Sequence, residues 1–234
     1  MIQLNPENPL QCIDLGTIGY QPALKLQQNL HTLRIQEKIP DTALFLEHNH
    51  VYTLGKRGDS ADVLLDTFQL HKRGVEVFRS DRGGQVTYHG PGQLVVYLII
   101  NLYNAQRELR LFVETLESTM IGWLANEFGI VSHIEAEHPG VWVGEHKIAA
   151  LGITVKNRVT MHGLALNVDP DLSFFAGIVP CGIRDRGVTS ISKLIPESPA
   201  MTSVKDSLAK ALASQFGKPG IIWADPGELP ENQS

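Results

Sequence analysis

The sequence predicts one α+β domain with a mixed, largely antiparallel sheet and helices packed on it. The segments 140–143, 147–156 and 159–167 are strand-like, and short polar interruptions at Gly144-Glu145 and Asn157-Arg158 lie between them. Such spacing is typical of consecutive antiparallel hairpins. The helix-like segments do not alternate with the strands one by one, which disfavours a doubly wound parallel sheet.

The length of 234 residues favours a single domain. A chain of this size can bury one sizeable core and does not require two. We expect residues 1–224 to form the domain and residues 225–234 to form a polar, disordered tail, because Leu229 is the only aliphatic residue there.

Three helices are expected where apolar residues recur every three or four positions. They cover residues 22–38, 110–128 and 204–216, and the last is preceded by a capping-box pattern of Ser203 and Asp206. The expected buried stripes are Leu26, Leu30 and Leu33; Val113, Leu116, Met120 and Leu124; and Val204, Leu208, Leu212 and Phe216.

Seven strands are expected from runs rich in β-branched and aromatic residues. In chain order they cover residues 43–46, 50–54, 75–78, 94–101, 140–143, 147–156 and 159–167. Cys12 lies in a further strand-like run with Ile13 and Leu15, and we expect it to be a small buried side chain. Trp142 is expected in the core.

The composition excludes several classes of protein. A hydrophobic fraction of 43% and a charged fraction of 19% are typical of a globular protein, and the net charge of −5 gives no support to nucleic-acid binding. The apolar run 94–100 is too short to span a bilayer, and the N-terminal residues have no signal-peptide pattern. A cytoplasmic protein without membrane or nucleic-acid partners is expected, and its two cysteines do not make a disulfide framework.

Residues 82–93, Arg-Gly-Gly-Gln-Val-Thr-Tyr-His-Gly-Pro-Gly-Gln, form the most informative segment. Glycine removes the Cβ obstruction, so the backbone can approach a bound group closely. Arg82, Gln85, Thr87 and His89 add directed polar groups. A glycine-rich hairpin end is the alternative interpretation.

Cys181 and Lys147 are the candidate reactive residues. Cys181 stands between Pro180 and Gly182, which favours a thiol displayed on a loop, although an isolated cysteine is more often buried and inert. Lys147 precedes an apolar run, where desolvation lowers the pKa of an ammonium and a neighbouring thiolate raises it. The two groups could exchange a proton. A solvated strand residue is the alternative for Lys147.

Four segments resemble the octanoyltransferases of lipoate biosynthesis, the octanoyl-[acyl carrier protein]:protein N-octanoyltransferase family, and they follow one another in the order that this family has. They are the run 82–93, Lys-Ile-Ala-Ala-Leu-Gly at 147–152, His-Gly-Leu-Ala-Leu-Asn at 162–167 and Pro-Cys-Gly at 180–182. The resemblance implies the fold of the biotin/lipoate protein ligase catalytic domain. It also implies ping-pong transfer of an octanoyl group from octanoyl-acyl carrier protein to the lysine amine of lipoyl domains.

The resemblance assigns roles to particular residues. Cys181 is the acyl-thioester nucleophile, and Lys147 lowers its pKa. His162 is either a supporting residue that orients the acyl carbonyl or the lysine, or a core histidine whose hydrogen bonds are satisfied. The implied substrate-binding residues are Arg82, Gly83, Gly84, Gln85, Val86, Thr87, Tyr88, His89, Ala150, Leu151, Gly152, Gly163, Leu164 and Ala165.

No cofactor and no metal are expected, since no compact ligand set accompanies His48 and His50. The implied acceptors are the lipoyl domains of 2-oxoacid dehydrogenases and the glycine cleavage H protein. Lys56-Arg57 and Arg184-Asp185-Arg186 are candidate contacts for an acidic carrier protein.

Two other functions fit part of the pattern. An ATP-dependent lipoate or biotin protein ligase would share the fold and the lysine, but it forms an acyl-adenylate and needs no nucleophilic thiol, so Cys181 favours the transferase. A non-catalytic carrier-binding or lipoyl-domain-binding module would not need Cys181, Lys147 and His89 together.

Overall fold

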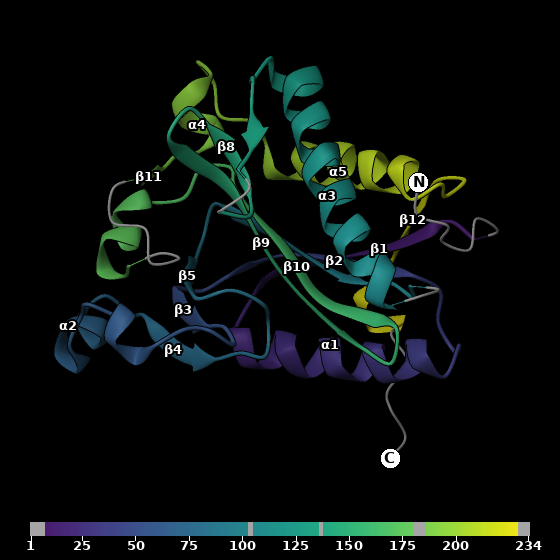
Figure 1. Cartoon of the computed structure of the whole chain (residues 1–234), viewed down its shortest axis with the longest axis horizontal. Helices are drawn as coiled ribbons and strands as arrows, with labels where there is room; N and C mark the ends of the chain where they lie inside the picture. The colour runs from purple at the N-terminus through teal and green to yellow at the C-terminus, as the bar shows by residue number, and fades with distance from the viewer. Residues whose placement is uncertain (1–7, 103–104, 136–137, 180–185, 229–234) are drawn as a thin grey trace.

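The structure is a computed structural model that describes residues 8–102, 105–135, 138–179 and 186–228. A nine-stranded mixed sheet forms its centre (Figure 1). Its main path runs in space through β12 (Ile221–Ala224), β1 (Leu10–Ile18), β2 (Thr42–His48), β6 (Gln93–Ile99), β10 (Val159–Asn167), β9 (His146–Lys156), β8 (Val141–Val143) and β7 (His133–Ile134). β11 (Gly187–Val188) pairs with β9 beside this path.

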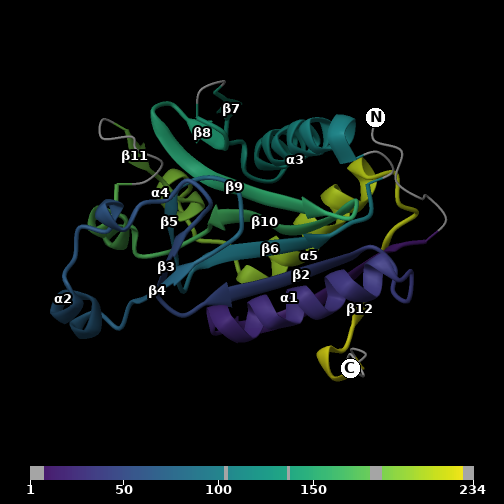
Figure 2. The same cartoon turned by 60° about the horizontal axis from the view of Figure 1, so that its bottom comes forward.

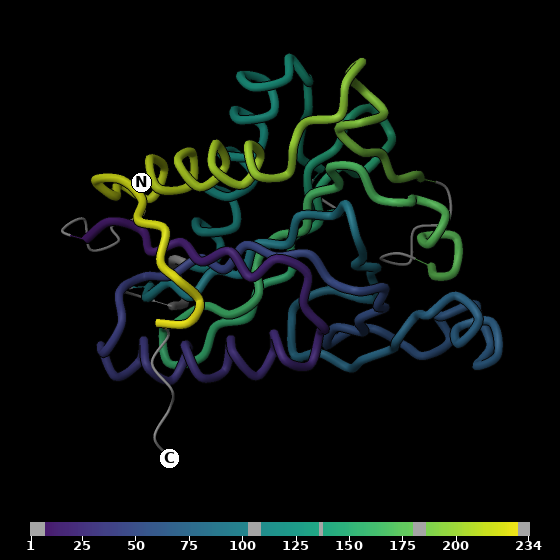
Figure 3. The backbone as a smooth tube through the Cα atoms, turned by 180° about the vertical axis from the view of Figure 1, so that it is seen from behind, coloured from purple at the N-terminus to yellow at the C-terminus, as the bar shows by residue number. Residues whose placement is uncertain are grey.

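The sheet is antiparallel except where β1 pairs with β2 and β12 and where β11 pairs with β9. The first and last strands lie side by side when the molecule is seen from behind (Figure 3). The predicted meander of β8, β9 and β10 is confirmed. Its second turn places Asn157 and Arg158 at φ 49° and 65°, the positive values that a tight hairpin turn requires. The predicted α+β class with a mixed sheet is confirmed.

A second, three-stranded sheet lies at one end of the first (Figures 1 and 2). Its order is β4 (Glu76–Arg79), β3 (Val51–Leu54) and β5 (Val86–His89), and the short helix α2 (Thr67–Lys72) belongs to the same region. Two residues connect β2 to β3, and three residues connect β5 to β6. These short connections hold the smaller sheet against the main one.

Helices cover both faces of the main sheet (Figure 2). α1 (Tyr20–Ile35) packs on one face with Leu44 and Leu46 of β2, and α3 (Ala105–Phe128) and α5 (Met201–Gln215) pack on the other with Ala43 and Phe45. This alternation follows from the two-residue period of a strand. Cys12 is fully buried on the α3 side, as predicted. No described helix is long and apolar enough to cross a membrane.

The predicted start of the third helix is wrong. α5 begins at Met201 with Ala200 as its N-cap, so Ser203 lies inside the helix and does not cap it. The Asp206 carboxylate instead accepts hydrogen bonds from Lys210 and Trp223. α1 ends at Ile35 and not at residue 38, because Glu37 takes a φ of 57° that a helix does not allow.

The remaining elements are short. They are α4 (Ile191–Leu194) and the 3-10 helices Ser60–Asp62, Leu172–Gly177 and Pro226–Glu228. Within the predicted polar tail, Pro226–Glu228 form the last of these 3-10 helices and residues 229–234 lie outside the described residues. The domain boundary at residue 224 stays a prediction.

A buried ion cluster joins α1, β2 and the segment after α5. The Asp41 carboxylate, whose side chain is 1% exposed, accepts from Arg34 Nε at 2.9 Å and from Lys218 Nζ at 2.7 Å. It also accepts from the backbone N–H of Asn101 at 3.0 Å. Buried charges need partners of this kind, because their desolvation is costly.

Replacing Asp41 with Ala should destabilise the protein by about 3–5 kcal/mol, because Arg34 and Lys218 would lose the carboxylate that compensates their burial. Urea denaturation of the variant measures this loss. Glu114→Ala, which breaks an exposed pair with Arg110 within α3, is the matched control and should cost far less. Similar losses in the two variants would contradict the role of the cluster.

Candidate functional site

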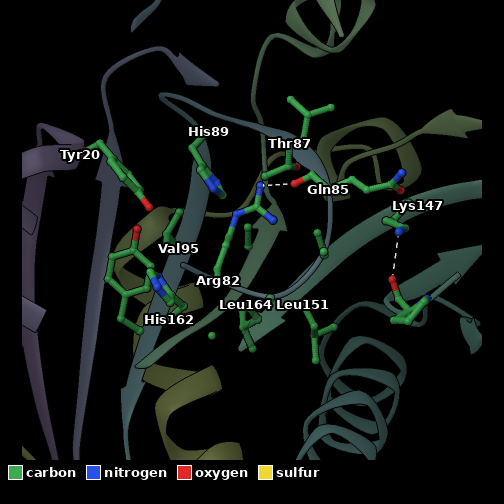
Figure 4. A pocket seen from close by; sticks show the side chains of 18 residues that line it. Tyr20, Arg82, Gln85, Thr87, His89, Val95, Lys147, Leu151, His162 and Leu164 are labelled. Atoms are coloured by element: carbon green, nitrogen blue, oxygen red, sulfur yellow. Dashed lines mark hydrogen bonds between the residues drawn. The ribbon is translucent and has the colours of Figure 1, made fainter. Parts of the chain in front are cut away.

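A cavity lies between the two sheets, under the loop that follows β4 (Figure 4). β5 of the smaller sheet lies on one side of it, and β6, β10 and β9 of the main sheet lie on the other. Its lining residues are Tyr20, Arg82, Gly84, Gln85, Val86, Thr87, His89, Val95, Tyr97, Pro139, Lys147, Ala150, Leu151, Gly152, His162, Gly163, Leu164 and Ala165. The segments 82–89, 150–152 and 163–165, which are far apart in the sequence, therefore meet at one site.

The Arg82 side chain holds the roof of this cavity. It is 8% exposed, and its guanidinium donates to Thr53 Oγ1 at 3.0 Å and to the carbonyl oxygens of Gly83 at 2.9 Å and Gln85 at 2.7 Å. A fourth hydrogen bond reaches the carbonyl oxygen of Thr53 at 2.5 Å. The planar guanidinium fixes the loop against β3, because its donors have a rigid geometry.

Two glycines let this loop lie directly on β9. The N–H of Gly83 donates to the carbonyl oxygen of Ile153 at 3.3 Å, and a Cβ on Gly83 would stand 3.1 Å from the same oxygen. A Cβ on Gly152 would stand 3.2 Å from the carbonyl oxygen of Gly83. Gly84 has a φ of 87°, a conformation that favours glycine. These residues shape the wall, and Gly83 itself does not line the cavity.

Two neutral histidines lie at the cavity: His89 lines it, and His48 is hydrogen-bonded to the lining residue Tyr97. His48 Nδ1 lies 2.8 Å from the carbonyl oxygen of Ile18, so it must donate, and Nε2 then accepts from the Tyr97 hydroxyl at 2.7 Å. His89 Nδ1 donates to Gln93 Oε1 at 2.7 Å. Burial lowers the pKa of His48 to about 4 and holds that of His89 well below its usual value. Neither ring carries a charge near neutral pH.

His162 is a buried histidine at the edge of the cavity. Its side chain is 2% exposed, yet it lines the cavity, and Nε2 lies 2.8 Å from Asp81 Oδ1. This hydrogen bond holds the pKa of Asp81 below its usual value. His162 has a φ of 60° within β10, and its N–H donates to Gln27 Oε1 at 2.9 Å. Such a conformation in a non-glycine residue is strained.

Lys147 lies at the opposite end of the cavity from His162 (Figure 4). Its Nζ donates to the carbonyl oxygen of Pro139 at 2.9 Å and stands 4.8 Å from the centre of the Trp142 ring. Gly140 is the residue after Pro139, and its backbone N–H donates to the buried Glu117 carboxylate at 3.1 Å. Burial raises the pKa of Glu117. Glu117 therefore fixes the turn that orients the lysine.

A second cavity shares Thr87, Lys147, Ala150 and Ala165 with the first. It extends from Lys147 toward Trp142, Phe175, Arg186 and Val188, among other residues. Lys147 thus stands where the two cavities meet. A group bound beside Lys147 can therefore be contacted by residues of both cavities.

The structure brings together most of the predicted site. Gly83 lies against β9 without lining the cavity. Tyr88 is turned away from the cavity, because its hydroxyl hydrogen-bonds His50 at 2.8 Å and its ring packs in the core of the smaller sheet. Cys181 lies outside the described residues, as do Arg184 and Asp185. Arg186 pairs with Glu135 and stacks over Trp142. Within the described residues, no group of three or more His, Cys, Asp or Glu side chains could hold a metal.

Four lining residues were missed by the sequence analysis: Tyr20, Val95, Tyr97 and Pro139. Tyr20 opens α1, Val95 and Tyr97 lie in the strand that follows the glycine-rich segment, and Pro139 precedes β8. The two-residue spacing of Val95 and Tyr97 was a usable signal, since both side chains face the same side of β6.

The chain belongs to the lipoyl protein ligase A/B catalytic domain family, whose model matches residues 19–213. It is 46% identical over 205 residues to an octanoyltransferase from Caldicellulosiruptor bescii, which covers 87% of this chain and 90% of that one. It is 40% identical over 225 residues to a mitochondrial octanoyltransferase from Arabidopsis thaliana, with 94% of each chain covered.

Solved structures share the fold at low sequence identity. A lipoate protein ligase from Thermoplasma acidophilum matches with a TM-score of 0.74 and 15% identity over 95% of this chain and 89% of that one. A biotin protein ligase from Aquifex aeolicus matches with a TM-score of 0.53 and 15% identity over 89% of this chain and 70% of that one. The predicted fold family is therefore confirmed.

The free energy of unfolding should fall as the pH drops from 6.5 to 4, partly because of His48. Its folded pKa of about 4 lies below the unfolded value, so the unfolded chain binds the proton first. One such group contributes up to about 1.4 kcal/mol per pH unit in this window. Urea denaturation of His48→Gln between pH 7 and pH 4 should show a shallower slope than wild type.

The exposed His71→Gln variant controls for the substitution itself. Equal slopes in wild type and His48→Gln would show that His48 is not held neutral by burial.

Proposed function

We propose that this protein is an octanoyltransferase that moves an octanoyl group from octanoyl-acyl carrier protein to a lysine amine of a lipoyl domain. The observation that carries the proposal is the cavity itself, which is assembled from the implied acyl-binding segments and has Lys147 at one end. The 46% identity to an octanoyltransferase supports the same reaction.

The proposed reaction has two steps. The Cys181 thiolate attacks the donor's thioester carbonyl, a new thioester forms, and the carrier's thiolate leaves and takes a proton from the Lys147 ammonium. The acceptor's neutral lysine amine then attacks the Cys181 thioester, an amide forms, and the thiolate is released. Lys147 stabilises the thiolate as an ammonium and, once neutral, accepts the proton that the attacking amine loses. No cofactor is required.

The cavity walls suit an uncharged acyl chain. Val86, Val95, Ala150 and Ala165 supply apolar surface, which methylene groups prefer to water. The buried His48 and His89 are neutral, so an apolar ligand does not have to lie beside a charged imidazole.

Both partners in this proposal are proteins. Lys56 and Arg57 are exposed, and their backbone N–H groups donate to the carbonyl oxygens of Arg82 and Gly84. They therefore stand on the cavity roof, where their charge would attract an acidic carrier protein. The lipoyl domains of 2-oxoacid dehydrogenases and the glycine cleavage H protein are the proposed acceptors. A reducing compartment such as the cytoplasm would keep Cys181 as a thiol.

Incubation with octanoyl-carrier protein alone should add one octanoyl group to the wild type, as read by intact-mass analysis. Cys181→Ala should form no adduct, whereas Cys12→Ser should form it normally because Cys12 is fully buried, with its pKa raised to about 12 by desolvation. An octanoylated Cys181→Ala protein would contradict the assignment. Product formation from free octanoate only with ATP would favour the ligase.

Lys147→Ala should slow acylation strongly at pH 7 and recover part of the rate as the pH rises, because hydroxide can ionise the unsupported thiol. Recovery of transfer to the lipoyl domain should be weaker, since the amine would still lack its proton acceptor. Single-turnover rates and thiol alkylation rates across pH measure both effects. Identical pH profiles in variant and wild type would remove Lys147 from the mechanism.

A further inference from the structure

Two tyrosines close the end of the cavity that lies away from Lys147. Tyr20 and His162 lie together on one side of Figure 4, Lys147 lies on the other, and Leu151 and Leu164 lie between them. Tyr97 belongs to the same closed end, because its ring centroid is 6.0 Å from that of His162 and its hydroxyl is bound to His48. A chain anchored beside Lys147 therefore extends toward two phenol rings.

Both rings are held in place by hydrogen bonds at their far ends. The Tyr20 hydroxyl donates to Ser80 Oγ at 2.8 Å, and the Tyr97 hydroxyl donates to His48 Nε2 at 2.7 Å. His48 cannot turn away, because its Nδ1 is committed to the carbonyl oxygen of Ile18. Neither tyrosine can retreat without leaving a buried polar group unpaired, which is costly.

Ring packing gives the same wall a second constraint. The Tyr20 ring lies 5.4 Å from the centroids of His48 and Phe78, and the Tyr97 ring lies 5.9 Å from that of His48. Tyr20 and Tyr97 are 2% and 4% exposed. A close-packed interior of this kind yields little to an inserted group.

We infer that Tyr20 and Tyr97 set the longest acyl chain that this site accepts. This inference rests on the proposed function, because it takes the acyl group to lie in the cavity with its carbonyl beside Lys147. The terminal methyl of an octanoyl group then points toward the two phenol rings, and a chain of twelve carbons would have to displace the rings or turn aside. The tyrosines are specificity-determining residues and take no part in the chemistry.

The test compares octanoyl-carrier protein with dodecanoyl-carrier protein as donors in single-turnover acylation. Wild type should prefer octanoyl strongly. Tyr20→Ala and Tyr97→Ala, made separately, should each raise the dodecanoyl-to-octanoyl rate ratio at least tenfold, because the missing ring lengthens the cavity. Tyr20→Phe and Tyr97→Phe keep the ring and should retain most of the wild-type ratio.

Tyr52→Ala is the matched control, since Tyr52 is a fully buried tyrosine of the smaller sheet that does not line the cavity. Its ratio should stay at the wild-type value, and melting temperatures show which variants are folded. An unchanged ratio in folded Tyr20→Ala and Tyr97→Ala would overturn the inference. Wild-type protein that accepts both donors equally would overturn it too, because a long chain would then turn into the second cavity beside Trp142 and Phe175.

A second readout does not depend on thioester chemistry. Free dodecanoate should raise the melting temperature of Tyr97→Ala more than that of wild type, whereas free octanoate should act in the reverse order. If no protein forms an acyl adduct but these shifts appear, the proposed reaction is wrong and the length limit stands. If adducts form and dodecanoate binds wild type as well as octanoate does, the length limit is wrong and the reaction stands.

Discussion

The site depends on one buried side chain, the Arg82 guanidinium. Its hydrogen bonds to Thr53, Gly83 and Gln85 fix the loop after β4 to the smaller sheet. Gly83 then rests on the backbone of Ile153 in β9. The cavity is the space that this arrangement leaves between the two sheets. An arginine at the centre of a binding site therefore acts here on the protein's own carbonyl oxygens, and its contribution is the shape of the wall.

Several polar side chains around this space form hydrogen bonds with each other in their uncharged forms. The Tyr97 hydroxyl donates a hydrogen bond to His48, and His89 donates one to Gln93. Because burial keeps both imidazoles neutral, the cavity remains compatible with an apolar chain although its far end is lined by hydroxyl and imidazole groups. Lys147 supplies positive charge at the other end. This asymmetry fits a substrate whose reactive carbonyl and apolar end need different surroundings.

The sequence predicted the elements whose signals are local. The hairpins of β8, β9 and β10 follow from alternation and from turn residues such as Asn157 and Arg158. It did not predict β12, because that strand pairs in parallel with β1 from the far end of the chain. Tyr20, Tyr97 and Glu117 were missed for a related reason: each looks like an ordinary core or helix residue until tertiary packing places it. Tyr88 was included in the site because its motif is continuous, but its side chain turns into the smaller sheet.

The central claim is that an acyl chain on Cys181 runs along the cavity between β5 and β9, past Gly152 and Gly163. A crystal structure of the octanoylated protein tests this claim most directly. We predict continuous density from the Cys181 sulfur past Lys147 to a terminal methyl in contact with the Tyr20 and Tyr97 rings. Density that leads instead into the second cavity, against Trp142 and Phe175, would contradict the account.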